Sequence, residues 1–194
     1  MPGAASRRLI RICFDLNVWV ADFLGTRRRR CGGSSPWLAE AVRAATCPAG
    51  PLQLVVSLGM LERLASVLER RFAVDPAVAD AAVRAIGTIA TVGPAGDFPY
   101  VLAGGGTDPI RDAEDRHVLE VAVAGRADVL ATANLADFDM AGIASVGDGA
   151  RVRIDASPGG TRLVIAHPDQ VRNWLREGVV PTVEVAAAFN ASRS

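Results

Sequence analysis

Acidic and amide side chains recur in this sequence just after short apolar runs or near the start of helical patterns. Their oxygen atoms are the groups that hard divalent cations bind. The set is Asp15, Glu62, Asp112, Asp115, Asn134 and Asp137. In an open parallel sheet, the loops that leave the carboxyl ends of the strands converge, so residues at those ends gather in space. We therefore expect these side chains to meet at one edge of a sheet.

Carboxylates that gather in this way repel each other, and a bound divalent cation offsets that repulsion. Oxygen ligands without a nearby Cys or His favour Mg²⁺ or Mn²⁺ over zinc. Such an ion binds a substrate phosphate, activates a water molecule and neutralises the leaving oxygen. The acidic set therefore predicts metal-dependent hydrolysis of phosphodiester bonds.

Strand and helix patterns alternate along the chain and can position these residues. Apolar, β-rich runs predict strands over 9–16, 52–57, 128–132 and 162–166. Helical patterns cover 18–24, 36–45, 58–72, a segment that opens at Asp75-Pro76, 112–125 and 169–177. This order predicts an α/β fold, with a central, mostly parallel sheet covered by helices on both faces.

The length of 194 residues predicts a single domain over 1–194, with its core at about 9–177. The Arg-rich and Gly-rich stretch 25–35 is interpreted as a loop insertion, and 178–194 as a C-terminal extension. The chain shows neither an apolar run of membrane-spanning length nor a secretory signal pattern at its start, which predicts a cytoplasmic protein without membrane contact.

Composition excludes several kinds of chemistry. The 21 basic residues, which balance 21 acidic ones, are all Arg. A P-loop and a Schiff base both need Lys, so neither can form here. The three cysteines, Cys13, Cys31 and Cys47, lack the spacing of zinc or redox pairs. With no net charge, any attraction for RNA must be local.

Three segments resemble, in order, the acidic motifs of the PIN domain family: FDLNVWV, VVSLGMLERL and DAEDRHVLEVAVAGRADVLATANLADF. The later HPDQVRNWL is similar to the closing segment of bacterial members. The resemblance implies a three-layer α/β/α fold, a Mg²⁺- or Mn²⁺-dependent endoribonuclease, and kinship with the toxins of VapBC-type toxin–antitoxin pairs. A small antitoxin protein and a second copy in a homodimer are then the expected protein partners.

The resemblance also assigns roles by matching position. Asp15 is the first acid, Glu62 the second and Asp115 the third. The fourth position falls at Asn134, where many members carry Asp, with Asp137 a turn later. Asp112, three residues before Asp115, can also reach the metal or can cap its helix.

Further residues are candidates for supporting roles. Asn17 and Thr132 can hydrogen-bond to the metal-binding carboxylates. The run Arg27, Arg28, Arg29 and Arg30 can grip RNA phosphates, or it can be a solvated loop. A solvent-exposed helix face is the ordinary setting for a Glu such as Glu62.

Two other functions compete with the ribonuclease. The motif FDLN also suits a phosphatase of the haloacid dehalogenase type, but Asn17 stands where its second catalytic Asp is expected, and its phosphate-binding Lys is missing. The other alternative is a PIN fold that binds RNA or a partner protein without cleaving, which Asn134 makes plausible.

Overall fold

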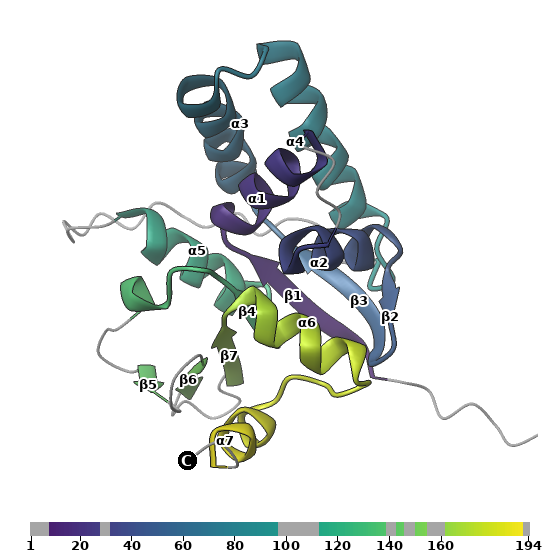
Figure 1. Cartoon of the computed structure of the whole chain (residues 1–194), viewed down its shortest axis with the longest axis vertical. Helices are drawn as coiled ribbons and strands as arrows, with labels where there is room; N and C mark the ends of the chain where they lie inside the picture. The colour runs from purple at the N-terminus through teal and green to yellow at the C-terminus, as the bar shows by residue number, and fades with distance from the viewer. Residues whose placement is uncertain are drawn as a thin grey trace, which may run out of the picture.

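A mixed sheet forms the centre of the molecule (Figure 1). The computed structural model describes residues 8–27, 32–96, 113–138, 143–145, 150–154 and 162–191. The strands of this sheet are β1 (Ile10–Phe14), β2 (Thr46–Cys47), β3 (Gly50–Val55), β4 (Val129–Ala131), β5 (Ile143–Ser145), β6 (Ala150–Ile154) and β7 (Arg162–Ala166). Their spatial order is β2-β3-β1-β4-β7-β6-β5. The central strands β3, β1, β4 and β7 run parallel, and β2, β6 and β5 pair antiparallel at the sides.

The register of the parallel strands aligns their carboxyl ends. Phe14 of β1 pairs with Ala131 of β4, which in turn pairs with Ala166 of β7. The ladder continues one residue further, because the Asp15 amide donates to the Ala131 carbonyl and the Thr132 amide donates to the Ala166 carbonyl, both at 3.0 Å. Asp15 and Thr132 therefore lie next to each other where the two strands end.

Helices cover both faces of the sheet and make the expected three layers. They are α1 (Leu16–Arg27), α2 (Ser34–Arg43), α3 (Leu58–Phe72), α4 (Pro76–Thr91), α5 (Ala113–Ala124), α6 (Pro168–Arg176) and α7 (Val183–Ala191), with a 3₁₀ turn η1 (Leu135–Phe138). Helices α2 and α6 contact each other over one face, α5 covers the other, and α3 packs along α4 (Figure 1). The three-layer α/β/α fold with a parallel centre is thus confirmed.

The central strands are buried on both faces, as the strands of a parallel sheet usually are. In β1, Ile10, Ile12, Cys13 and Phe14 are all fully buried, although successive side chains point to opposite faces. Burial raises the pKa of the Cys13 thiol, and the charge of Asp15 raises it further. Cys13 therefore stays protonated and acts as a core residue.

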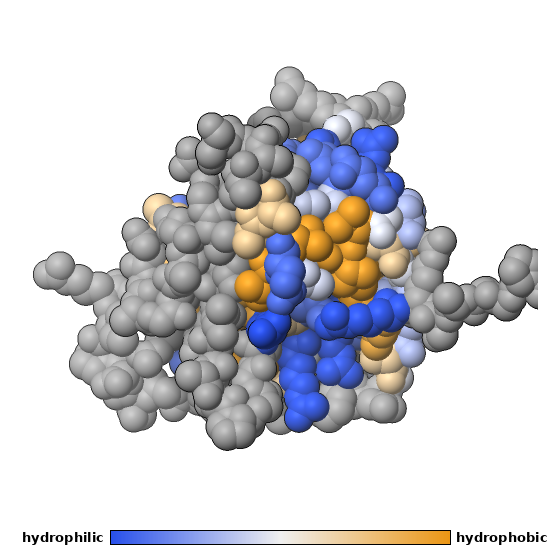
Figure 2. Space-filling view, turned by 90° about the horizontal axis from the view of Figure 1, so that it is seen from below, coloured by the Kyte–Doolittle hydropathy of each residue, from blue (hydrophilic) through white to orange (hydrophobic). Residues whose placement is uncertain are grey.

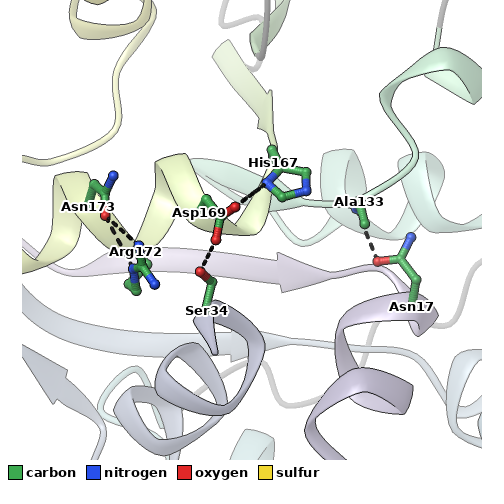
Figure 3. Close-up of polar contacts among 7 residues, drawn as sticks. All are labelled: Asn17, Ser34, Ala133, His167, Asp169, Arg172 and Asn173. Carbon is green, nitrogen blue, oxygen red and sulfur yellow. Dashed lines mark hydrogen bonds and ion pairs between the residues drawn. The ribbon is translucent and has the colours of Figure 1, made fainter. Parts of the chain in front are cut away.

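Side-chain caps fix where several helices begin. Ser57 accepts a hydrogen bond from the Met60 amide at 3.2 Å at the start of α3, and Asp75 caps α4 through the Ala77 amide. At the start of α6, His167 Nδ1 accepts from the Asp169 amide at 3.2 Å. The same nitrogen lies 3.4 Å from the Asp169 carboxylate, the contact that Figure 3 draws. The Ser34 hydroxyl donates to the Asp169 carboxylate, so the first turns of α2 and α6 are tied together (Figure 3).

Several elements differ from the sequence-based prediction. Helix α1 begins at Leu16 and continues through Gly25 to Arg27, so the first residues of the predicted loop 25–35 are helical, while 28–31 lie outside the described residues. Strands β2, β5 and β6 were not expected. β2 and β5 have only two and three residues, and β6, with the sequence ARVRI, alternates Arg with apolar residues and so lacks an apolar run. Helix α7, inside the predicted C-terminal extension, contacts β7 and β6 and buries Ala186.

The amino ends of the parallel strands lie on the side of the molecule where α7 packs. Arg8 pairs with Asp128 just before β4, and Arg162 of β7 pairs with Glu184 of α7. The Arg11 amide also donates to Asp128 at 2.8 Å. Figure 2 views this side and shows hydrophobic residues bordered by hydrophilic ones. In the described part of the chain, no helix is long and apolar enough to cross a membrane.

Candidate active site

Asp15 is a buried carboxylate at the carboxyl end of β1. Only 7% of its surface is exposed. Its Oδ2 accepts hydrogen bonds from the Asn17 amide nitrogen at 2.5 Å and from the Thr132 hydroxyl at 2.7 Å. The structure thus brings both residues that were expected to support a metal-binding carboxylate into contact with Asp15.

Thr132 and Asn17 also tie the loop after β4 to the start of α1. Besides donating to Asp15, the Thr132 hydroxyl accepts from the Asn134 amide at 3.0 Å and from the Asn17 side chain at 3.2 Å. The Asn17 side-chain oxygen accepts from the Ala133 amide at 3.1 Å (Figure 3). Because Thr132 is fully buried, its hydroxyl is shielded from water and helps to hold the Asp15 carboxylate in one orientation.

A cavity of about 510 Å³ opens beside Asp15. It is bounded by the start of α1, the second half of α3, α5 and the loop after β4. Its lining residues are Asp15, Leu16, Asn17, Val20, Val67, Arg71, Phe72, Val118, Asn134 and Asp137. Asp15, Asn134 and Asp137, which the sequence placed at one sheet edge, therefore line one cavity.

The charges in this cavity are poorly balanced. Burial raises the pKa of Asp15, and the nearby negative charge of Asp137 raises it as well. The hydrogen bonds from Thr132 and from the Leu16 and Asn17 backbone act in the opposite direction and only partly offset these effects. A cation placed between Asp15 and Asp137 would favour the ionised form of both carboxylates.

The donor set of the cavity suits a hard divalent cation. Asp15 and Asp137 bring carboxylate oxygens and Asn134 an amide oxygen, while no Cys or His lines the cavity among the described residues. Within the part of the chain that the structure describes, no group of three His, Cys, Asp or Glu side chains comes together as a metal site. Asp115, the acidic residue that the sequence assigns to the start of α5, is among residues 113–116, whose side chains lie outside the described set.

Glu62 lies elsewhere and is not brought to this cavity. It is exposed and lines a different groove of about 530 Å³ between α3 and α4, together with Asp80 and Arg84. The reason is helical geometry: at 3.6 residues per turn, Glu62 and Arg71 point to opposite sides of α3. The residues that α3 does place in the Asp15 cavity are Val67, Arg71 and Phe72.

The remaining predicted residues lie near the limits of the described chain. Asp115 belongs to the first turn of α5, but its side chain is outside the described set, as are Asp112 and the run 28–30. Arg27 ends α1, where its guanidinium lies 6.0 Å from the centre of the Phe23 ring, and it does not line the cavity.

Sequence reasoning missed one residue that lines this cavity, Arg71, and one contact outside it, between His117 and Ser57. Arg71 brings a guanidinium to the cavity, and no pattern distinguished it from other helix-surface arginines. His117 Nε2 lies 3.1 Å from the Ser57 hydroxyl and so joins α5 to the start of α3. A Cβ at Gly59 would lie 3.0 Å from His117 Nε2, so a larger residue at this position would require the imidazole to shift.

Comparison with known proteins identifies the family of this chain. Residues 11–136, more than half of the chain, match a family model described as a PIN domain. The match begins in β1 and ends within the loop after β4, and so includes Asp15, Thr132 and Asn134. No curated protein and no solved structure matches the chain.

Proposed function

The chain belongs to the PIN domain family, and from this premise we propose that it is a Mg²⁺- or Mn²⁺-dependent endoribonuclease. PIN domains are generally nucleases that use divalent metal ions. The observation that carries the proposal is the buried Asp15 carboxylate, held by Asn17 and Thr132 and sharing a cavity with Asp137. Two carboxylates without a cation between them are an arrangement that costs stability and is typical of functional sites.

The proposed metal ligands are Asp15, Asp137, the amide oxygen of Asn134, and Asp115. Asp115 is included because it precedes the cavity-lining Val118 by three residues and so shares a helix face with it. Asp112, three residues before Asp115 in the sequence, is a further candidate. Glu62, which lines the groove between α3 and α4, is not part of this set.

The chain's own residues prepare the site for hydrolysis of a phosphodiester bond. Thr132 and Asn17 fix the orientation of Asp15, so that no reorganisation of this carboxylate is needed during the reaction. Val20, Val67 and Val118 form apolar walls that reduce the access of bulk water. When bound, the metal would supply Lewis acidity to the phosphate and lower the pKa of an attacking water.

The resemblance of the sequence motifs to those of VapBC-type toxins extends the proposal to a biological role. In that role the chain is the toxin of a pair, a small antitoxin covers the acidic edge of the sheet, and two copies form a homodimer. Inducing the protein in a bacterial host tests this: wild type should arrest growth and Asp15→Asn should not. Arrest by both variants would contradict a toxin that acts through this site.

The biochemical test is cleavage of labelled single-stranded RNA by the purified protein in Mg²⁺, Mn²⁺ or EDTA. Cleavage should require metal and vanish in Asp15→Asn and Asp115→Asn, while Glu62→Gln is the matched control on α3 and should keep wild-type activity. If neither wild type nor the two Asp variants cleave the RNA in any metal, the result would instead favour a PIN scaffold that binds without cleaving.

A further inference from the structure

A second hollow lies on α3 directly beside the acidic cavity. It measures about 230 Å³ and is lined by Arg63, Ser66, Val67, Arg70 and Arg71. Val67 and Arg71 line both this hollow and the acidic cavity, so the two adjoin at these side chains. A basic surface thus leads away from the carboxylates along one side of the helix.

Two of the three arginines of this surface differ from paired arginines elsewhere in the molecule. Arg70 and Arg71 are exposed and form no ion pair within the described part of the chain, whereas Arg84 pairs with Asp80 and Arg43 with Asp22. Basic residues in the last turn of a helix also stabilise its C-terminus. That effect explains neither why Arg71 reaches the acidic cavity nor why Arg63, two turns earlier, lines the same hollow.

The need for such a surface follows from electrostatics. A cavity lined by Asp15 and Asp137 repels a polyanion, and a chain with no net charge offers no long-range attraction to overcome this. Guanidinium groups beside the carboxylates supply that attraction locally, because they form charge-assisted, two-pronged hydrogen bonds with phosphates.

We propose that Arg70 and Arg71, with Arg63 beside them, bind backbone phosphates of the RNA next to the bond that is cleaved. A single strand then runs from the acidic cavity along α3, and Arg71 contacts the phosphate nearest to the cavity. The inference rests on the proposed function for the identity of the polyanion, and it names the path that this substrate takes.

The test is binding of a short fluorescein-labelled single-stranded RNA, followed by fluorescence anisotropy in EDTA. Every protein carries Asp15→Asn so that no RNA is cleaved. Against this background, the pair Arg70→Gln and Arg71→Gln should bind more weakly between about 50 and 200 mM salt, and the slope of log K against log[salt] should fall by about 0.7 for each phosphate that is no longer neutralised. Arg84→Gln is the matched control, because Arg84 belongs to α4 and lines the groove between α3 and α4. This variant should leave the RNA affinity and the salt slope unchanged.

Replacing the same two residues by Lys should recover most of the salt slope, because the charge returns without the two-pronged geometry. Thermal unfolding of each variant checks that the fold is intact. Wild-type affinity and slope in the Gln pair would overturn the proposal, and so would an equal loss in Arg84→Gln. Because binding is measured without metal, a protein that binds through these arginines but never cleaves would refute only the nuclease.

Discussion

The amino edge of the parallel sheet, where its strands begin, and the carboxyl edge, where they end, each hold an aspartate that is at least partly buried. The surroundings of the two aspartates are opposite in charge. At the amino edge, Asp128 pairs with Arg8 and accepts a hydrogen bond from the Arg11 amide. At the carboxyl edge, Asp15 is held by the neutral side chains of Asn17 and Thr132 and shares its cavity with Asp137. Burial raises the pKa of both aspartates.

The two aspartates differ in the groups that offset the effect of burial on their pKa. For Asp128, the Arg11 amide and then the charges of Arg8 and Arg11 lower the pKa, and these partners belong to the protein itself. For Asp15, the charge that shifts the pKa is that of Asp137, which raises it. A buried carboxylate with its own cation serves the fold, whereas one that faces another carboxylate needs a cation from outside.

The largest expected effect is on RNA cleavage, which should be lost when Asp15 is replaced and kept when Asp128 is replaced. Asp15→Asn should lower RNA cleavage by more than about a hundredfold, because even residues that only orient a metal ligand change activity by about 10–100-fold. Asp128→Asn, the same substitution at the other edge, should leave cleavage near the wild-type rate. Initial rates with Mn²⁺ measure both, and an equal loss in the two variants would remove the functional distinction between the edges.

Thr132→Val tests the support of Asp15 and should lower metal affinity or cleavage by about 10–100-fold. The Thr132 hydrogen bond lowers the pKa of Asp15, so its loss raises that pKa further. The acid limb of the pH–rate profile should therefore move to higher pH. Thr132→Ser, which keeps the hydroxyl, is the control, and an unchanged limb in Thr132→Val would show that the hydroxyl does not act through Asp15.

How far the sequence predicts the molecule depends on the kind of pattern involved. β1 and β3 were predicted because long apolar runs mark buried strands, and α3 because its apolar stripe and its Ser57 cap agree. Asp15, Thr132 and Asn134 lie at or just after the carboxyl ends of predicted parallel strands, so the sequence could predict that they meet at one edge of the sheet. These are consequences of periodicity and topology.

The side of a helix that faces a site is less accessible to sequence reasoning. Glu62 and Arg63 differ by one position, yet Glu62 lines the groove against α4 and Arg63 lines the hollow beside the acidic cavity. A step of one residue turns a helix by more than a quarter of a circle, and the apolar stripe alone does not tell which flank meets the site. Helix α7 was missed because its Ala-rich and Val-rich sequence lacks a clear periodicity.

Substitutions of the two aspartates should affect the stability of the fold in the reverse order to their effects on cleavage. The loss of stability is expected at Asp128, whereas the loss of cleavage is expected at Asp15. Asp128→Ala leaves the Arg11 amide without its acceptor and should cost about 1–3 kcal/mol. Asp15→Asn should instead stabilise the metal-free protein at neutral pH. The raised pKa of Asp15 means that its contribution to stability is complete below the unfolded value, near 3.8, and is lost as pH rises through the folded value.

Denaturant unfolding in EDTA at neutral and at acidic pH measures both effects. The gain from Asp15→Asn should shrink as pH falls, because wild-type Asp15 then becomes neutral as well. Added Mn²⁺ should stabilise wild type more than Asp15→Asn, since only wild type offers this carboxylate as a ligand. A loss of stability in Asp15→Asn at neutral pH would mean that the ionised carboxylate is already well compensated within the protein.

The smallest effect is expected from the exposed ion pair between Arg162 and Glu184, which joins β7 to α7 at the amino edge. The side chains are 65% and 66% exposed, so water and salt screen the attraction. Arg162→Gln should leave both cleavage and the melting temperature near wild-type values, although the pair spans two elements. A clear drop in melting temperature would show that α7 is held by this contact rather than by burial of Ala186, and charge pairing would then matter more to the amino edge than exposure suggests.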